Sequence, residues 1–279
     1  MIIDFHTHTF PEKIAAAALL KMQGDCHSAA FTKGTQKALC DSMAKSGIDY
    51  SVVLPVVTNP LKCANINQIS IEENNKNGLI YFGGIHPDTE NFAEELKNLA
   101  ENGVKGIKIH PVYQGVDIDD IRYLRIIEKA AEFGLIVVTH AGNDIGFPGV
   151  FRCTPQMLAN VTKRVKGAKI VAAHMGGWRN WEEAAALLQN TDIYIDTAFS
   201  LGSITPLDDG YYSAEELKLL DNNEFLNLIK AFGSHRVLFG TDSPWDAQDL
   251  SVERISSLPL AEGEKENIFS KNALRILDM

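Results

Sequence analysis

The amino-acid sequence predicts one α/β domain, a closed (β/α)8 or TIM barrel that spans residues 1–279. Eight short apolar runs alternate with helical patterns, and a chain of this length suits a single barrel. The runs are rich in Val, Ile and Leu without strict polar alternation, as expected for parallel strands covered on both faces. An open doubly wound sheet is the alternative, but the glycine-rich phosphate fingerprint that often marks such sheets does not follow the first run.

Each apolar run is expected to form a strand and each amphipathic stretch a helix. The expected strands are Ile2–Phe5, Ser51–Val57, Leu79–Ile85, Gly106–His110, Leu135–Thr139, Lys169–Ala173, Ile193–Ala198 and Arg236–Gly240. The expected helices are Glu12–Met22, Thr35–Lys45, Asn65–Asn77, Asn91–Glu101, Ile118–Phe133, Thr154–Val165, Trp181–Gln189, Glu224–Phe232, Gln248–Ser257 and Glu262–Leu277. The longest irregular stretches, Thr9–Gly34 and Leu201–Asn223, follow the first and seventh strands, so both should lie on the active rim and could cover a substrate.

Composition and charge narrow the classes of partner. The net charge is −10 with no basic run, which argues against nucleic acid as a main partner. No stretch approaches the ~18 apolar residues of a membrane span, and the N-terminus lacks the pattern of a signal peptide. The cysteines are far apart without a Cys-x-x-Cys motif, so we expect reduced thiols in a cytoplasmic protein rather than a cysteine-based zinc site. They are Cys26, Cys40, Cys63 and Cys153.

Histidines gather at the ends of the expected strands. Of the eight histidines, only His27 and His235 lie elsewhere. The six at strand ends are His6, His8, His86, His110, His140 and His174. The carboxyl ends of parallel barrel strands meet at one rim, where active sites lie. Because strand side chains alternate faces, His6 and His8 point the same way and can chelate an ion, although a lone His-x-His pair can also be ligand-free.

These side chains have the composition of a catalytic zinc-type site. His6, His8 and His140 with Asp242 supply three imidazoles and one carboxylate, which leaves a coordination position open for water. His174 would lie beside the metal as a proton-transfer group. The sequence therefore predicts one divalent metal, zinc in the first place, with manganese or cobalt as alternatives. For any single histidine, a satisfied core or rim residue is the competing interpretation.

Five motifs at these strand ends carry a family resemblance. They are Asp-Phe-His-Thr-His, Gly-Ile-Lys-Ile-His-Pro, Thr-His-Ala-Gly, Ala-His-Met-Gly-Gly and Gly-Thr-Asp-Ser-Pro-Trp, and they span positions 4–245. With these five motifs in this order, the sequence resembles the amidohydrolase superfamily. Within that superfamily it is similar to the amidohydrolase-related branch. That branch includes metal-dependent hydrolases and decarboxylases related to aminocarboxymuconate-semialdehyde decarboxylase. The resemblance implies that His6, His8 and His140 are metal ligands, that His174 and Asp242 handle the water proton, and that Asp242 is also a ligand.

Lys108 has two interpretations under this resemblance. In some relatives a lysine after the fourth strand is carboxylated and bridges two metals, whereas many members of this branch hold one metal. Lys108 lies two residues before His110, so it could instead neutralise an acidic substrate. We favour one metal.

Other residues near the expected rim are candidates for substrate binding. The full set is Lys108, His110, His86, Arg152, Trp178 and Trp245. Arg152 could bind a substrate carboxylate or be a solvated surface residue, and Trp178 and Trp245 could wall the pocket or pack in the core. We expect Asp4, on the strand face of His6, to support the metal ligands, and Asp196 to be structural rather than catalytic.

The predicted protein is a metal-dependent hydrolase of a small amide, ester, lactone or cyclic imide, with or without a carboxylate. A metal-activated water would attack after Asp242 or His174 accepts its proton. A non-oxidative decarboxylase that uses the same ligands is the alternative. A non-catalytic barrel that binds a small molecule is a second alternative. Assembly into a homo-oligomer is compatible with each of these predictions.

Overall fold

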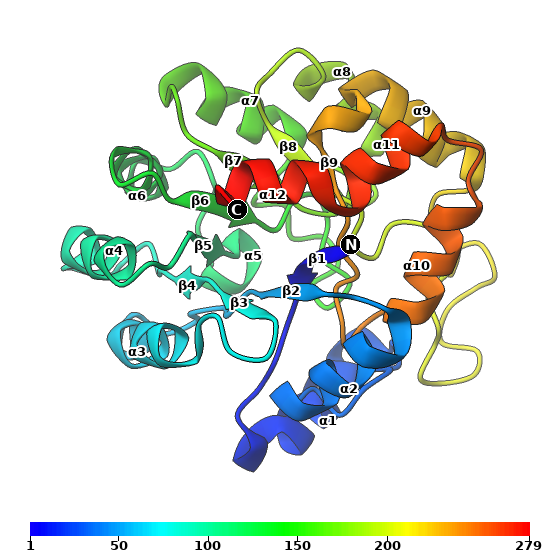
Figure 1. The fold of residues 1–279 in the computed structure, drawn as a ribbon, viewed down its shortest axis with the longest axis horizontal. Coiled ribbons are helices and arrows are strands. Elements are labelled where there is room, and N and C mark those ends of the chain that lie inside the picture. Colours follow the sequence, from blue (N-terminus) through cyan, green and yellow to red (C-terminus); the bar gives the residue numbers. More distant parts are fainter.

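Short parallel strands form the centre of the computed structural model, which describes residues 1–279 (Figure 1). The strands are β1 (Ile3–Thr7), β2 (Tyr50–Val53), β3 (Leu79–Tyr81), β4 (Gly83–Gly84), β5 (Gly106–Ile109), β6 (Ile136–Thr139), β7 (Ile170–Ala172), β8 (Tyr194–Asp196) and β9 (Val237–Leu238). They pair in chain order, as β1-β2-β3 and as β4-β5-β6-β7-β8-β9. Every pairing is parallel, as the predicted β-α alternation requires.

Backbone hydrogen bonds join these two sheets into a barrel. Only Phe82 separates β3 from β4, and its N–H donates to the Val53 carbonyl at 3.0 Å, so the two segments form the one predicted third strand. At the other seam the Phe5 N–H donates to the Phe239 carbonyl at 2.7 Å. The His8 N–H donates to the Ser243 carbonyl, also at 2.7 Å. The predicted (β/α)8 barrel is therefore the fold of this chain.

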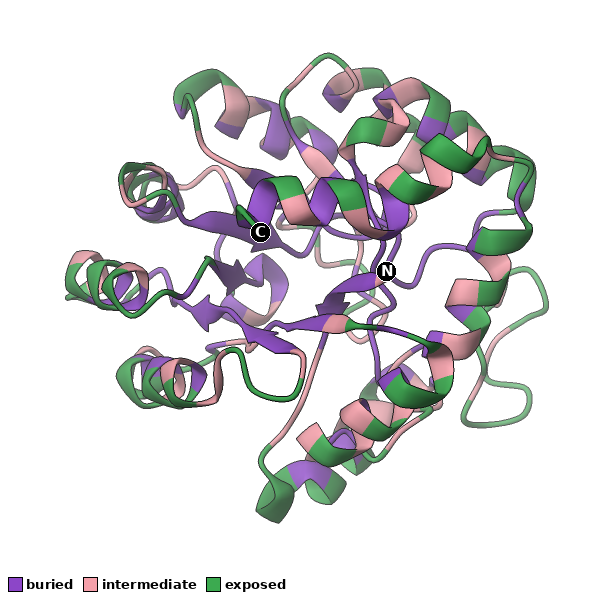
Figure 2. Cartoon of the chain, in the orientation of Figure 1, coloured by how far each residue is buried: buried purple, intermediate pink, exposed green.

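Helices cover the outside of the strands, with their exposed faces toward solvent (Figure 2). They are α1 (Glu12–Cys26), α2 (Gln36–Ser46), α3 (Cys63–Glu73), α4 (Phe92–Glu101), α5 (Pro111–Gln114), α6 (Ile121–Glu132), α7 (Pro155–Arg164), α8 (Trp181–Leu188), α9 (Asn222–Phe232), α10 (Gln248–Ser257), α11 (Glu262–Glu266) and α12 (Asn272–Leu277). Two short 3-10 helices, η1 (Pro60–Lys62) and η2 (Ser234–Arg236), and one short π-helix, η3 (Asn267–Lys271), are also present. None of the helices is both long and apolar enough to span a lipid bilayer.

Capping side chains fix where several of these helices begin. The Thr154 hydroxyl accepts from the Met157 N–H, with Pro155 at the first helical position of α7. In α9, Asp221 and Glu224 form a reciprocal capping box. Each cap satisfies backbone N–H groups that have no partner inside the helix, and so places the preceding loop at the barrel rim.

The apolar core has two layers, one inside the ring of strands and one between strands and helices. The inner layer includes Phe5, Leu54 and Phe82, together with Ile276 and Leu277 of α12. Since these α12 side chains pack with the strand interior, the last helix closes one end of the barrel, and it crosses the strands in Figure 1. The opposite end, at the carboxyl ends of the strands, carries the predicted site.

Two excursions of the chain meet at this rim. The first contains α1, which extends four residues beyond its predicted end at Met22, to Cys26. The second is the irregular segment 201–221. The two are joined at an antiparallel bridge between Ser28 and Pro206, where the Ala29 N–H donates to the Thr205 carbonyl at 2.9 Å.

Candidate metal centre

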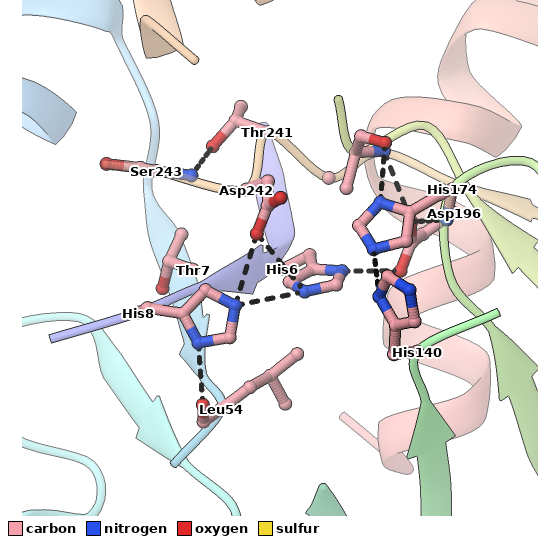
Figure 3. Close-up of polar contacts among 12 residues, drawn as sticks. His6, Thr7, His8, Leu54, His140, His174, Asp196, Thr241, Asp242 and Ser243 are labelled. Carbon is pink, nitrogen blue, oxygen red and sulfur yellow. Dashed lines mark hydrogen bonds and ion pairs between the residues drawn. The ribbon is translucent and has the colours of Figure 1, made fainter. Parts of the chain in front are cut away.

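Three side chains from the first and last strands converge at the rim (Figure 3). His6 Nε2 lies 3.2 Å from His8 Nε2. Asp242 Oδ1 lies 3.1 Å from His8 Nε2 and 3.5 Å from His6 Nε2. Two atoms each about 2.1 Å from one metal ion, at angles of about 90–109°, would themselves be about 3.0–3.4 Å apart. The spacing of this trio therefore fits ligands of a single divalent ion.

Hydrogen bonds on the far side of each imidazole decide which nitrogen faces the trio. His6 Nδ1 lies 2.9 Å from Asp196 Oδ2, and His8 Nδ1 lies 2.8 Å from the Leu54 carbonyl oxygen. A carbonyl and a carboxylate can only accept, so we assign the hydrogen of each ring to Nδ1. Both Nε2 atoms then present lone pairs toward the Asp242 carboxylate. The Lys108 Nζ reaches one of these three acceptors, His6 Nε2, at 3.2 Å, and a cation shared by all three would agree with the donor set of a metal site.

His140 and His174 form a second pair with the same arrangement. His140 Nδ1 lies 3.1 Å from His174 Nε2. The outer nitrogens are 3.0 Å from backbone carbonyls, His140 Nε2 from Asn143 and His174 Nδ1 from Ala198. By the same argument, the two facing nitrogens both carry lone pairs. The predicted ligand His140 thus belongs to this neighbouring pair rather than to the trio, and the His6 and His174 ring centres are 5.2 Å apart.

Backbone contacts hold these groups in register. The Asp242 N–H donates to the His6 carbonyl at 2.8 Å, which fixes the last strand end against the first. Asp196 Oδ1 accepts from the His174 N–H at 2.9 Å, so one buried carboxylate orients both His6 and His174. His174 and Asp242 have φ of 60° and 66°, a left-handed conformation that non-glycine residues rarely adopt. Such strain is often found where a surrounding network holds functional groups in place.

Asp4 supports the site in a different way from the one its position in the motif suggests. The pairing of β1 with β2 shifts between Asp4 and Thr7, so β1 contains an extra residue there and strict alternation of faces is lost. The Asp4 carboxylate accepts from the Thr241 hydroxyl at 2.6 Å and from Gln248 Nε2 at 2.8 Å. Its contact with His6 is only with the backbone N–H, at 3.2 Å.

Burial sets the charge state of the site. It lowers the pKa of His6 and of His140 well below the usual histidine value, so both rings are neutral and able to bind a metal. Burial also lowers the pKa of Lys108 to about 8, and its Nζ lies 3.2 Å from His6 Nε2. Burial raises the pKa of Asp196. Lys108 is therefore the cationic side chain that reaches the trio.

The other predicted substrate-binding residues lie at varying places around the rim. His110 stacks on the His140 ring at 4.3 Å between centres. His86 is buried, and its Nδ1 accepts from the Asp88 N–H at 3.1 Å. Trp178 Nε1 donates to the Phe199 carbonyl at 3.1 Å. These contacts place His110 beside the site, whereas those of His86 and Trp178 are with neighbouring segments of the rim.

Arg152 and Trp245 complete the predicted set. Arg152 Nη1 lies 2.8 Å from Asp117 Oδ1, and no hydrogen bond or ion pair links the guanidinium to the histidines. Trp245 follows Asp242, to whose carbonyl its N–H donates at 2.8 Å, and packs at the edge of a small apolar cluster that includes Trp178.

Sequence reasoning missed one acidic side chain of this region. Asp144 is buried and its Oδ2 lies 3.5 Å from His110 Nε2 and 3.7 Å from His140 Nε2. It lies in the loop after β6, outside any strand, so the pattern of strand-end residues does not point to it. The signal that was available is its position four residues after His140 within a run of small residues.

The comparison with protein families gives this site its context. The family model described as Amidohydrolase matches residues 3–279. The chain therefore belongs to the amidohydrolase family, which confirms the resemblance seen in the motifs. The family has hydrolase and decarboxylase members and generally uses a divalent metal.

Solved structures resemble the chain over its whole length. An uncharacterised TIM-barrel protein from Bordetella bronchiseptica is 16% identical, with a TM-score of 0.75 over 99% of this chain and 98% of that one. The 5-carboxyvanillate decarboxylase of Sphingomonas paucimobilis is 15% identical, with a TM-score of 0.69 over 100% and 99%. A dihydroxybenzoic acid decarboxylase from Polaromonas sp., with bound manganese and the inhibitor 2-nitroresorcinol, is 14% identical, with a TM-score of 0.69 over 99% and 96%. At these identities the likeness establishes the fold alone.

A curated relative matches only a short part of the chain. The D-hydantoinase of Rhizobium radiobacter is 39% identical over 56 residues, which are 20% of this chain and 12% of that enzyme.

Proposed function

We propose that this protein is a metal-dependent hydrolase that uses an activated water on a small substrate. The observation that supports the proposal most strongly is the convergence of lone pairs from His6, His8 and Asp242 at 3.1–3.5 Å. Neutral imidazoles with one carboxylate suit zinc, and manganese or cobalt would also be accepted by this donor set. His140 is the fourth ligand in this proposal, supplied from the adjacent pair.

A divalent ion at this position would act as a Lewis acid that polarises a substrate carbonyl and lowers the pKa of water to about 7. Asp242 and His174 are the groups that would accept a proton and return it to the leaving group. His174 suits this role because the Ala198 carbonyl holds its Nδ1–H at 3.0 Å and leaves Nε2 as an acceptor. Lys108 adds positive charge where negative charge would develop on the substrate oxygen.

The proposed substrates are small amides, esters, lactones and cyclic imides. The local match to a D-hydantoinase supports a cyclic amide or imide within this group. Lys108 is buried beside the trio, so a substrate with one carboxylate would have a charge partner there.

Decarboxylation is the second candidate reaction. Its support is the whole-length structural likeness to two decarboxylases, one of them with bound manganese. The same ligands would serve, and His174 would deliver a proton to the carbon that loses carbon dioxide.

Isotope labelling separates these reactions. Metal-loaded protein is incubated in ¹⁸O-water with 5-substituted hydantoins, aryl esters, γ-lactones and hydroxylated aromatic carboxylates. Hydrolysis predicts ¹⁸O in the product and no release of carbon dioxide. Carbon dioxide release without ¹⁸O in the organic product would replace the hydrolase by the decarboxylase. Binding of these compounds without turnover by metal-loaded protein would favour a non-catalytic barrel.

A further inference from the structure

Asp144 is a buried carboxylate that forms no ion pair with a lysine or arginine. It lies between β6 and α7 and is 6% exposed. Its Oδ1 accepts from the Gly146 N–H at 2.8 Å, which fixes the orientation of the carboxylate within its own loop. The other oxygen, Oδ2, lies 3.5 Å from His110 Nε2 and 3.7 Å from His140 Nε2, and burial keeps both rings neutral by lowering their pKa well below the usual value. A buried charge without such partners would be costly, so these contacts indicate a specific role.

The tautomers of His110 and His140 place an Nε2–H group of each ring near Asp144 Oδ2. The Tyr113 N–H donates to His110 Nδ1 at 3.4 Å, so the hydrogen of the His110 ring lies on Nε2, 3.5 Å from the carboxylate. His140 Nε2 donates to the Asn143 carbonyl at 3.0 Å and lies 3.7 Å from the same carboxylate oxygen. Both Nε2–H groups therefore have their positive ends near Oδ2.

This assignment argues against a second metal between these three residues. A metal needs a lone pair from each imidazole, whereas both Nε2 atoms here carry hydrogen. The free lone pair of His140 is instead on Nδ1, which faces His174 Nε2 at 3.1 Å.

We infer that Asp144 is a positioning residue, which reinforces the Nε2–H tautomer of His140 that the Asn143 carbonyl selects, and so keeps the Nδ1 lone pair directed at His174 and the proposed metal. The Asn143 carbonyl and Asp144 restrain one edge of the ring, and the stacked His110 ring restrains its face at 4.3 Å. A carboxylate beside Nε2–H also makes Nδ1 a stronger donor to a cation. Only the part of this inference that concerns the metal rests on the proposed function.

The test compares Asp144→Asn with Asp117→Asn. The asparagine keeps the size of the side chain and an oxygen for the Gly146 N–H, but removes the charge near the two Nε2–H groups. Asp117 contacts Arg152 of the same loop at 2.8 Å and has no contact with the histidines. Asp117→Asn therefore removes a different contact that anchors this loop. If Asp144 merely anchored the loop, the two substitutions would have the same effect.

Two measurements report the effect of Asp144→Asn, one on the His140 tautomer and one on zinc affinity. In metal-free protein, ¹⁵N NMR of the imidazoles reports the tautomer of His140, whose signals are identified by their absence in His140→Gln. Wild type and Asp117→Asn should show a protonated Nε2. Asp144→Asn should show a larger fraction of the Nδ1–H tautomer, because the Asn143 carbonyl alone would then select Nε2–H. Competition with a chelating dye should show zinc binding about 10–100-fold weaker in Asp144→Asn than in wild type and Asp117→Asn.

The outcomes separate this inference from the proposed function. An unchanged His140 tautomer in Asp144→Asn would overturn the inference, as would equal effects of the two substitutions. If wild-type protein binds no metal, the proposed function fails, while the tautomer comparison still decides the role of Asp144.

Discussion

At the scale of single residues, hydrogen bonds to the outer nitrogens determine what the histidines can do. Acceptors occupy the outer nitrogens of His6, His8, His140 and His174, so the inner nitrogens all present lone pairs. Two of the four outer contacts are with backbone carbonyls of neighbouring strand ends, at Leu54 and Ala198. The barrel itself therefore sets the tautomers that a metal site needs.

The substitution His174→Asn separates metal binding from proton transfer. If His174 transfers protons and is not a required ligand, the variant should keep its metal and lose about 10²–10⁴-fold in turnover. Metal content and turnover are measured on one preparation. Loss of metal in proportion to turnover would make His174 a ligand, and an unchanged rate would leave Asp242 as the only proton-transfer group.

The sequence predicted which side chains meet but not every contact that orients them. Strand-end positions were sufficient to bring His6, His8 and Asp242 together, because parallel strands share one rim. The carboxylate partner of His6 is Asp196, 190 residues along the chain, and nothing in the local pattern specifies that pairing. Asp144 was missed because its role depends on loop geometry that has no sequence period.

At the scale of elements, the eight expected strands are present, and their lengths are the main difference. The run expected over Ser51–Val57 pairs only over Tyr50–Val53, and that over Arg236–Gly240 only over Val237–Leu238. Beyond these short pairings single backbone hydrogen bonds continue, from the Leu54 N–H to the Thr7 carbonyl and from the Phe5 N–H to the Phe239 carbonyl. Apolar patterning predicts burial, and it does not determine where hydrogen-bonded pairing stops.

The two rim excursions are held together by side chains as well as by backbone. His27 Nδ1 lies 2.8 Å from Asp208 Oδ2, and the His27 ring stacks on Tyr211 at 3.4 Å between centres. The Tyr212 hydroxyl donates to the Cys26 carbonyl at 2.6 Å. These contacts tie the segment after β8 to the end of α1.

Removal of one of these contacts should loosen the joined excursions. Tyr212→Phe deletes a hydrogen bond that contributes about 1 kcal/mol, so local opening should increase about fivefold. This local opening is measured by hydrogen exchange of the Ala29 and Leu207 amides, which both donate hydrogen bonds across the two segments. Tyr50→Phe in β2 is the matched control. Equal exchange in both variants would show that this hydroxyl does not hold the segments together.

At the scale of the whole molecule, the barrel buries a positive charge at the carboxyl ends of its strands. The Lys108 side chain is 1% exposed, and burial lowers its pKa from the usual 10.5 to about 8. Between these values the unfolded chain binds a proton that the folded chain does not. Stability should therefore rise with pH from about 8 to 10.5 through this group, by up to about 3 kcal/mol.

Lys108→Met tests that dependence in metal-free protein. The variant should unfold at higher urea concentration than wild type near pH 7.5, and the difference should shrink as the pH approaches 10.5. Urea unfolding at several pH values gives the free energy of unfolding of wild type and of Lys108→Met. A difference that is constant across this range would show that Lys108 titrates normally in the folded protein.

The central claim is that His6, His8 and Asp242 hold a catalytic divalent metal. The metal content of the purified protein tests this claim most directly. Elemental analysis is performed on wild type, His6→Ala and His86→Ala, the last a strand-end histidine outside the trio. We predict about one metal per chain in wild type and His86→Ala and a near-complete loss in His6→Ala. Equal metal content in all three proteins, or none in wild type after growth with zinc and manganese, would contradict the claim.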